Sequence, residues 1–340
     1  MITPMPAPIP EHTGLDDAAV RQRIIEAQHP AVLRGFVSHW PAVQSGTGGA
    51  DSLPQYLKRF DSGTSVDAIL MPAEEEGRLA YNAAMDGFNF VRNRLPIAAV
   101  AEQILRYAKF ERPPSVAVQS ALISDCLPGF TAENRLTVLP DTVLPRIWLG
   151  NAITTPAHLD EWHNIGCVIC GRRRFTLFPP EQVANLYIGP LDFAPTGVPM
   201  SLVQLHAPDL NRFPRFREAW AAAMSAELEA GDAIYIPPLW WHHVVSLDKM
   251  NALVNYWWHA QAGESAGGAS SFLSLLHAVL SVRQLPSATR ESWRALFEHY
   301  VFGPQHGVSD HMPPERRGVL GELSNEELAR ARAQALQRLK

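Results

Sequence analysis

The chain has 340 residues, of which 46% are hydrophobic and 19% are charged, a balance typical of a folded globular protein rather than a disordered or fibrous one. Its formal net charge is −5 and its longest basic run is only Arg172-Arg173-Arg174, so the composition gives no support for nucleic-acid binding. Three cysteines are too few for a disulfide framework and no apolar run has the length of a membrane span, so we expect a cytoplasmic protein without a membrane segment.

The first third of the chain, residues 1–114, predicts an extension of mixed α and β character. Helices are expected over residues 16–28, where apolar side chains recur on one face, and over residues 53–60. Residues 95–110 show a stronger helical pattern, because Pro96 suits the first turn and apolar residues follow at helical spacing. We expect this extension to pack against the domain that follows it.

Between residues 115 and 262 the pattern changes to short β-rich runs separated by proline, glycine and aspartate, which is typical of an antiparallel barrel or sandwich. A long insertion at 180–228 carries a helical piece at 216–228, and insertions of this length usually form lids or binding surfaces. The predicted fold class is therefore mainly β with flanking helices. The expected strands cover residues 146–150, 154–159, 165–170, 173–178, 233–236, 243–247 and 252–258.

Cys167 and Cys170 form a CxxC pair inside one of these predicted strands. Residues three apart on a strand face opposite sides, whereas a redox or zinc pair needs both sulfurs on one side of a turn. No second cysteine pair exists to complete a zinc site. We therefore expect two core residues rather than a reactive or metal-binding pair.

The last part of the chain, residues 263–340, predicts helices again. A final helix should open at the capping box formed by Ser324 and Glu327. The helices either cover the barrel or pair with a second copy of the chain, and we expect a homodimer formed through them. Two apolar stripes recur at helical spacing, Phe272, Leu275, Leu276 and Val279 on one helix and Trp293, Leu296, Phe297 and Tyr300 on the next.

A candidate metal site begins with His158 and Asp160. They lie two residues apart in a predicted strand, so both side chains point to the same face and can reach one cation. The triplet alone is weak support, because chance produces such triplets in a chain with 13 histidines. The segment 231–243 supplies two candidates for a third ligand, His242 and His243. Two histidines and one carboxylate on one face of a metal are the ligands of non-haem iron(II) oxygenases.

Four motifs occur in order around these residues. They are TPAHLDEWHN at 155–164, GRRRFTLFPP at 171–180, YIPPLWWHH at 235–243 and NYWW at 255–258. As an ordered set they resemble the cupin-like branch of the Jumonji-C iron(II)/2-oxoglutarate-dependent oxygenases, to which asparaginyl hydroxylases belong. The resemblance implies a double-stranded β-helix core of the cupin or jelly-roll type, with an N-terminal α/β extension and C-terminal helices.

The resemblance also implies which residues hold the metal. His158, Asp160 and His242 match the iron ligands of the family. His163 and His243 then point away from the metal, and strand parity agrees with separating each of them from its neighbouring ligand. Asp160 favours hydroxylation over halogenation, because the related halogenases lack this carboxylate.

Four further residues match the cosubstrate site of the family. The far carboxylate of 2-oxoglutarate would meet Arg173 and Thr155, although the nearest relatives have lysine where Arg173 stands, and the two side chains are not interchangeable. The alternative for Arg173 is a surface arginine in a basic hairpin. The resemblance places Asn164 and Asn255 beside the iron and the cosubstrate. Core and rim packing, rather than substrate contact, is expected of Trp240, Trp241, Trp257 and Trp258.

The sequence therefore predicts an iron(II)- and 2-oxoglutarate-dependent dioxygenase that hydroxylates a protein side chain, a peptide or a small molecule. The acidic charge balance makes nucleic acid the less favoured substrate. Two alternatives stay open. A cupin that binds metal without oxidation, as an isomerase or ligand-binding protein, would need neither Arg173 nor Thr155. A helical-dimer interaction module would need no metal ligands.

Overall fold

The computed structural model describes residues 5–195, 197–259, 271–304 and 307–338. The chain divides into two compact units, Met1–Gly267 and Gly268–Lys340. The N-terminal extension and the β-rich region therefore lie together in the first unit. No helix among the described residues is both long and apolar enough to cross a membrane.

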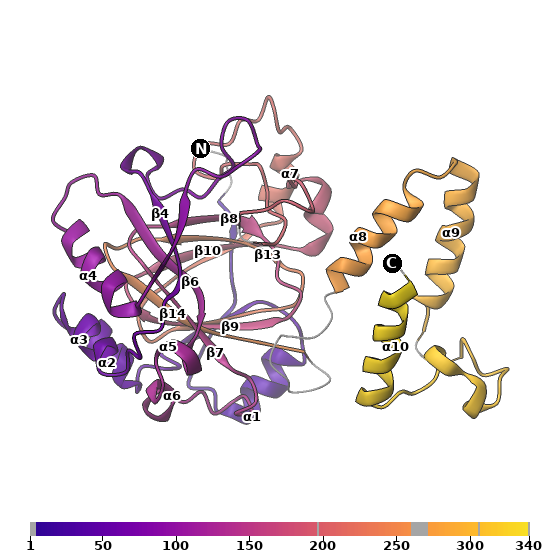
Figure 1. The fold of residues 1–340 in the computed structure, drawn as a ribbon, viewed down its shortest axis with the longest axis horizontal. Helices are drawn as coiled ribbons and strands as arrows, with labels where there is room; N and C mark the ends of the chain where they lie inside the picture. Colours follow the sequence, from indigo (N-terminus) through magenta and orange to yellow (C-terminus); the bar gives the residue numbers. More distant parts are fainter. Residues whose placement is uncertain (1–4, 196, 260–270, 305–306, 339–340) are drawn as a thin grey trace. The chain divides into compact units, whose positions relative to one another are not determined.

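Two sheets pack face to face in the first unit (Figure 1). The large sheet has nine strands in the order β2 (Glu11–Thr13), β3 (Ala31–Arg34), β12 (Ala233–Ile236), β9 (His163–Cys170), β14 (Asn251–Trp258), β7 (Pro145–Gly150), β6 (Ser115–Leu122), β4 (Val66–Met71) and β5 (Val91–Leu95). The small sheet has five strands in the order β1 (Ala7–Pro8), β11 (Met224–Leu228), β10 (Arg173–Phe178), β13 (Trp241–Ser246) and β8 (Thr154–His158). Neighbouring strands are antiparallel except in the pairs β1 with β11 and β2 with β3. This arrangement confirms the predicted mainly-β class and is consistent with a double-stranded β-helix core.

Helices from the first half of the chain cover the other face of the large sheet (Figure 1). They include the helices expected near residues 16–28, 53–60 and 95–110. The strands β4 and β5 in the same extension were not predicted, although they widen the sheet. The helices are α1 (Asp17–Val20), which continues as a π-helical turn (Arg21–Ile25), α2 (Pro41–Gly46), α3 (Ser52–Lys58), α4 (Ile97–Tyr107), α5 (Ile123–Cys126) and α6 (Phe130–Glu133).

The central strand β14 contributes side chains both to the core beneath the helices and to a cavity between the sheets. Its side chains alternate between the two faces, as strand geometry requires. Val254 and Tyr256 pack into the core beneath the helices. Asn255 and Trp257 point instead into the space between the sheets, where they line a cavity. Polar residues on a fully buried strand therefore mark the cavity side.

The insertion after β10 contains one predicted helix that is only half helical. Helix α7 covers Phe216–Ala221, and the remainder of the expected helix, Met224–Leu228, is strand β11. Met, Ala, Glu and Leu favour helices locally, but Met224 and Leu228 pack in the core between the sheets, and the segment pairs along β10. Tertiary pairing overrides local propensity here. The insertion also holds a 3-10 turn at Pro180–Ala184, and the extension holds another at Ala73–Glu75.

The turn between β9 and β10 requires glycine. Gly171 has a φ of +71°, and a Cβ at this position would lie 2.5 Å from the carbonyl oxygen of Met250. Only glycine accepts this backbone conformation without strain or a clash. The turn determines which of the three following arginines faces inward on β10.

The cysteine pair Cys167 and Cys170 is buried and unpaired, which confirms the expected core role. The expectation that the two side chains face opposite sides was wrong, because both belong to the core beneath the helices. The pairing of β9 with β14 shifts register between Ala252 and Leu253, and this irregularity changes the parity of Cys170.

The second unit is helical in its described residues. It contains α8 (Ser271–Val282), α9 (Ser287–Tyr300), 3-10 turns at Pro314–Arg316 and Gly318–Leu320, and α10 (Asn325–Arg338). The predicted capping box is present, because the Ser324 backbone N–H donates to Glu327 (2.9 Å) and the Glu327 N–H donates to Ser324 Oγ (3.3 Å).

Candidate metal centre

Three potential metal ligands meet between the two sheets. His158 ends β8, Asp160 follows in the next loop, and His242 on β13 lies directly opposite His158 in the strand pairing. One ligand atom from each lies within 4.8 Å of the others. The imidazole centroids are 4.1 Å apart, and His242 Nε2 is 3.5 Å from Asp160 Oδ2. In the part of the chain that the structure describes, this is the only such group of three.

Backbone carbonyls set the orientation of both imidazoles. His158 Nδ1 lies 2.8 Å from the carbonyl oxygen of Pro156, and His242 Nδ1 lies 3.1 Å from that of Trp240. A carbonyl oxygen only accepts, so each Nδ1 carries the proton and donates it. Each Nε2 is then left with a lone pair, as a metal ligand requires.

The Asp160 carboxylate is held by two side-chain donors. Trp257 Nε1 donates to its Oδ2 at 3.2 Å and Asn164 Nδ2 donates to the same atom at 3.3 Å. The Asp160 carbonyl accepts from the backbone N–H of Leu239 at 2.8 Å. Leu239 itself has a φ of 65°, an uncommon conformation for a branched residue, which brings the loop before His242 next to Asp160.

The protein around His158 favours its neutral form. Burial, together with the charge that His242 would carry, lowers the pKa of His158 to about 4. A neutral imidazole is the ligand form, so the site is ready for a metal near neutral pH. Burial also lowers the pKa of His243, to about 3.

The lowered pKa values of His158 and His243 predict how the stability of the fold depends on pH. In the unfolded chain a histidine takes up a proton near its ordinary pKa of 6.5, whereas folded His158 and His243 stay neutral down to about 4 and about 3. The unfolded state therefore binds more protons in this window, and we expect the melting temperature of the metal-free protein to fall as the pH drops from about 6.5 to about 3. The His243→Asn variant should lose part of this slope, because only the histidine titrates there. An unchanged slope in that variant would contradict the prediction.

All seven residues proposed from the sequence line one cavity between the sheets. Beside the three candidate ligands these are Thr155 on β8, Asn164 on β9, Arg173 on β10 and Asn255 on β14. Apolar side chains close the cavity toward the core, namely Phe175, Ile234, Ile236 and Leu253. The cavity is therefore polar on the side of the candidate ligands and apolar on the side of the core.

Arg173 is a buried cation that forms no ion pair with the residues that the structure describes. It is only 8% exposed, and its Nε has no hydrogen-bond partner among the described residues. Burial lowers its pKa to about 10, so the guanidinium is still charged at neutral pH. Its neighbours differ, because Arg172 pairs with Asp248 and Glu227, and Arg174 pairs with Glu227. A buried unpaired guanidinium is costly unless an anion binds to it.

A chain of hydrogen bonds joins the polar side chains of the cavity. Trp148 Nε1 donates to Asn255 Oδ1 (2.8 Å), and Asn255 Nδ2 donates to Asn164 Oδ1 (3.2 Å). Asn164 in turn donates to Asp160. Sequence reasoning missed Trp148 and assigned Trp257 to packing. Trp257 lies two residues after Asn255 on one strand, and this shared parity could have indicated that its side chain also faces the cavity.

The remaining histidines of the motifs face elsewhere. His163 Nδ1 lies 2.8 Å from the Tyr235 hydroxyl, and its ring stacks on Trp258. His243 lines a different cavity, on the other side of β8. Neither side chain lines the cavity that contains the candidate ligands.

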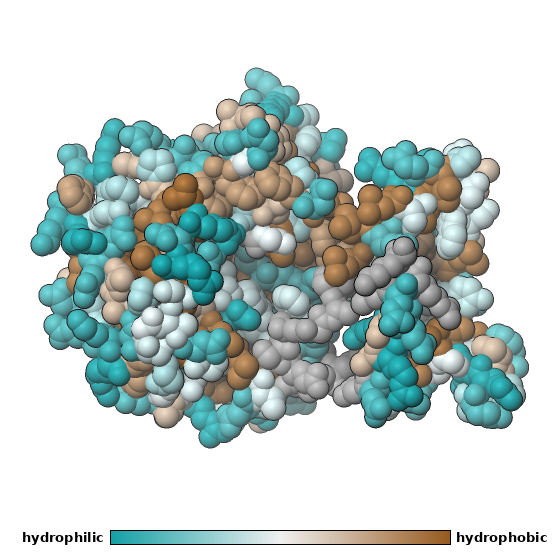
Figure 2. Space-filling model, viewed as in Figure 1, coloured by the Kyte–Doolittle hydropathy of each residue, from teal (hydrophilic) through white to brown (hydrophobic). Residues whose placement is uncertain are grey.

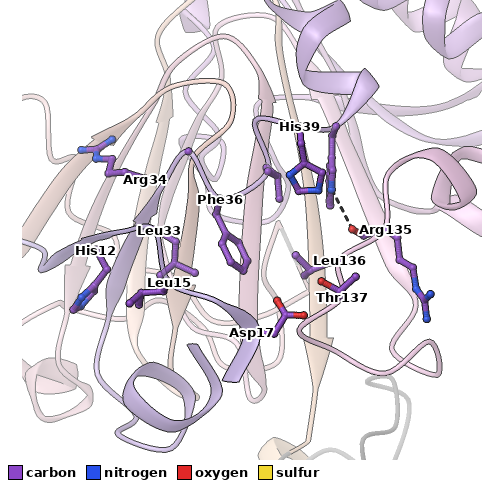
Figure 3. Close-up of a pocket in the computed structure, with 14 residues that line it drawn as sticks. His12, Leu15, Asp17, Leu33, Arg34, Phe36, His39, Arg135, Leu136 and Thr137 are labelled. Atoms are coloured by element: carbon purple, nitrogen blue, oxygen red, sulfur yellow. Dashed lines mark hydrogen bonds between the residues drawn. The ribbon is translucent and has the colours of Figure 1, made fainter. Parts of the chain in front are cut away.

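A further cavity lies between the N-terminal segment and the loop after β3 (Figure 3). Phe36 projects into it, with His12 and Asp17 at its edges. Its arginines are already engaged, because Arg34 pairs with Glu11 and Asp232, and Arg135 pairs with Asp141. It does not bring together three metal-ligating side chains.

Comparison with known proteins gives a family match and several relatives. The cupin-like domain family matches residues 17–264. The chain is 28% identical over 260 residues to the bifunctional peptidase and (3S)-lysyl hydroxylase JMJD7 of Homo sapiens, which covers 67% of this chain and 77% of that protein. It is 24% identical over 239 residues to lysine-specific demethylase 8 of Xenopus tropicalis, covering 70% and 50%. It is 32% identical over 146 residues to HSPB1-associated protein 1 of Homo sapiens, covering 42% of this chain but only 29% of that relative.

Proposed function

Because the chain belongs to the cupin-like family of Jumonji-C-type domains, we propose that it is an iron(II)- and 2-oxoglutarate-dependent oxygenase. Enzymes of this family use iron(II) and 2-oxoglutarate. The observation that carries the proposal is the joint presence, in one cavity, of the triad His158, Asp160 and His242 and of the unpaired Arg173. A metal alone would explain the triad, but only an anionic ligand explains the buried guanidinium.

The donor set fits iron(II). Two neutral imidazoles and one carboxylate supply three ligands, and Thr155 and Arg173 line the same cavity. Bound iron with 2-oxoglutarate and dioxygen supplies the oxidising chemistry in this family. The chain's own residues position the ligands: Trp257 and Asn164 orient the Asp160 carboxylate.

We assign the cosubstrate to the opposite part of the same cavity. The Arg173 guanidinium would bind the far carboxylate of 2-oxoglutarate, with the Thr155 hydroxyl as a second donor. Asn255, held by Trp148, keeps the Asn164 amide in place. The apolar base of the cavity excludes water, which strengthens each of these charged contacts.

Hydroxylation is the reaction we propose, on a protein side chain, a peptide or a small molecule. The carboxylate of Asp160 is retained, and one relative is a lysyl hydroxylase by name. A non-oxidative cupin would leave Arg173 without a purpose, because that function requires no anion at this position.

Titration of 2-oxoglutarate into the iron(II)-loaded protein under nitrogen tests the proposal. A keto acid bound to iron(II) gives a visible absorption band, which we expect for the wild type and not for His158→Ala. Iron binding without a band on addition of 2-oxoglutarate would refute the oxygenase proposal and favour a non-oxidative cupin.

The indole of Trp257 provides a milder test of how Asp160 is held. Trp257→Phe keeps an aromatic ring at this position but removes the indole N–H that donates to Asp160 Oδ2. Loss of a group that orients a ligand typically costs about 10- to 100-fold in metal affinity, and we expect a loss in that range. Competition with a chelator of known affinity measures it. The Trp240→Phe variant is the matched control, since no hydrogen bond from that indole to a ligand is present among the described residues.

We also propose a homodimer formed through the helical unit. Helices α8 and α9 expose large apolar side chains, including Leu275 (52%), Leu280 (71%) and Trp293 (41%). Figure 2 shows brown, hydrophobic surface over part of these helices. The double variant Leu275→Glu/Leu280→Glu is expected to convert a dimer into a monomer by light scattering. Ser274→Glu, which adds a charge to a polar position of the same helix, should leave the mass unchanged. A monomeric wild type would contradict the proposal.

A further inference from the structure

Three tryptophans lie together at one part of the cavity or beside it. Trp148 and Trp257 line it and meet edge to face, with centroids 6.1 Å apart, and Trp162 lies 6.2 Å from Trp257. Each indole N–H is already committed, to Asn255, Asp160 and His259 respectively. The rings therefore offer a substrate only their apolar faces.

Arg146 is the cation beside these rings. It lies two residues before Trp148 on β7, so both side chains leave the same face of the strand, and it pairs directly with Asn255 on β14. Its guanidinium lies over the Trp257 ring, 5.9 Å from the centroid. Arg146 does not line the inner cavity, which contains Arg173. The two arginines are therefore separate positive charges, and only Arg173 lines the inner cavity.

The guanidinium of Arg146 is anchored but not neutralised. Its Nη1 donates to the backbone carbonyl of Ser120 at 2.9 Å. No carboxylate of the described residues forms an ion pair with it within 4.0 Å, whereas Arg135, Arg172 and Arg174 each have such a partner. Several of its five donors thus remain available to a ligand.

Backbone strain holds the anchor in place. Ser120 has a φ of 50°, outside the conformations that a non-glycine residue prefers, and it lies in an irregularity between Val118 and Ala121 where β6 pairs with β7. Strained backbone of this kind often occurs where a side chain must be aimed. Here the strained Ser120 points its carbonyl oxygen at Arg146, which holds the guanidinium over the Trp257 ring.

We propose that Arg146 selects a substrate that carries a carboxylate close to the carbon to be hydroxylated. The indole faces would contact the aliphatic part, and the planar guanidinium would bind the carboxylate through two parallel hydrogen bonds. The inference rests on the proposed oxygenase function and adds the substrate class to it. The carboxylate can belong to an acidic side chain of a peptide or to a small acid.

Peptide pools with one defined central residue test the proposal by binding. Full-length protein loaded with manganese(II) and 2-oxoglutarate is immobilised under nitrogen, and hexapeptide pools with central Glu, Gln or Lys are applied. We expect wild type to retain the Glu pool about tenfold better than the Gln pool, as a charged hydrogen bond predicts. Arg146→Glu should reverse the preference toward Lys, and Arg146→Gln should abolish it. The charge control is Arg106→Glu on α4, an exposed position, which should behave as wild type.

The outcomes separate the inference from the function on which it rests. Thermal melting first confirms that each variant is folded. N-acetylglutamate amide is then added as a competitor, and displacement of the peptides by it distinguishes a small acid from a peptide as the ligand. Equal retention of the three pools, retention of none, or an unchanged preference in Arg146→Glu overturns the inference.

The same pools with iron(II) in air are then analysed for a gain of one oxygen. If the Glu, Gln and Lys pools are oxygenated to the same extent, only the inference about Arg146 is overturned. If retention depends on charge but no pool gains oxygen, only the oxygenase proposal is overturned.

Discussion

Replacing His158 with alanine is expected to abolish iron binding while the protein remains folded. The side chain provides one of three candidate ligands, and the Pro156 carbonyl at its Nδ1 orients the ring. Loss of groups that merely orient a ligand costs about 10- to 100-fold in affinity, so loss of a ligand should exceed about 100-fold. Activity should fall below detection with it.

Metal content after dialysis against iron(II) and chelator competition measure this effect. His39→Ala is the matched control, because His39 is exposed and borders the other cavity. It should bind iron as the wild type does. Because His158 is neutral in the metal-free protein, its removal creates no unpaired charge, so the melting temperature without metal should change little. Iron binding that survives in His158→Ala would exclude this metal centre.

Replacing Arg173 with methionine is expected to move cosubstrate affinity and stability in opposite directions. The guanidinium is buried without a counter-charge, and removing such a cation relieves a desolvation cost. The metal-free variant should therefore melt at a higher temperature than the wild type. Loss of a buried charged contact to the ligand costs about 2–4 kcal/mol, so the Kd for 2-oxoglutarate should rise by roughly 30- to 1,000-fold.

The lysine variant separates charge from shape. Arg173→Lys keeps the positive charge but loses the planar fork, so the rise in Kd should be smaller than in the methionine variant. Arg174→Met is the control, because that guanidinium is exposed and already paired with Glu227. Calorimetric titration of 2-oxoglutarate into the metal-loaded protein measures the affinities. A methionine variant that binds 2-oxoglutarate normally would remove Arg173 from the cosubstrate site.

Strand parity was a partial guide in the sequence. His158 and Asp160 do come together, but Asp160 lies in the loop after β8, where strand parity does not apply. On β10, Arg173 is buried and Arg174 is exposed, because a strand turns alternate side chains to opposite sides. The same reasoning failed for Cys170, where an irregular register changes the alternation. Parity is therefore dependable only within a regular pairing.

Residues far apart in the chain required the tertiary structure. The sequence left His242 and His243 as equal candidates until the resemblance separated them, whereas the pairing of β13 with β8 places His242 opposite His158. The strand β11 was hidden in a helix-like sequence, because its pairing with β10 and β1, which are far away in the chain, stabilises it.

The sequence by itself determined the types of ligand, their spacing and the mainly-β class, because local periodicity and residue chemistry encode these properties. Only the tertiary structure decided which charges are paired. Arg173 reads as one member of a basic run, yet it is the buried one without a partner, and Arg146 carries no motif at all. A counter-charge or its absence depends on residues from several strands, so no local pattern can reveal it.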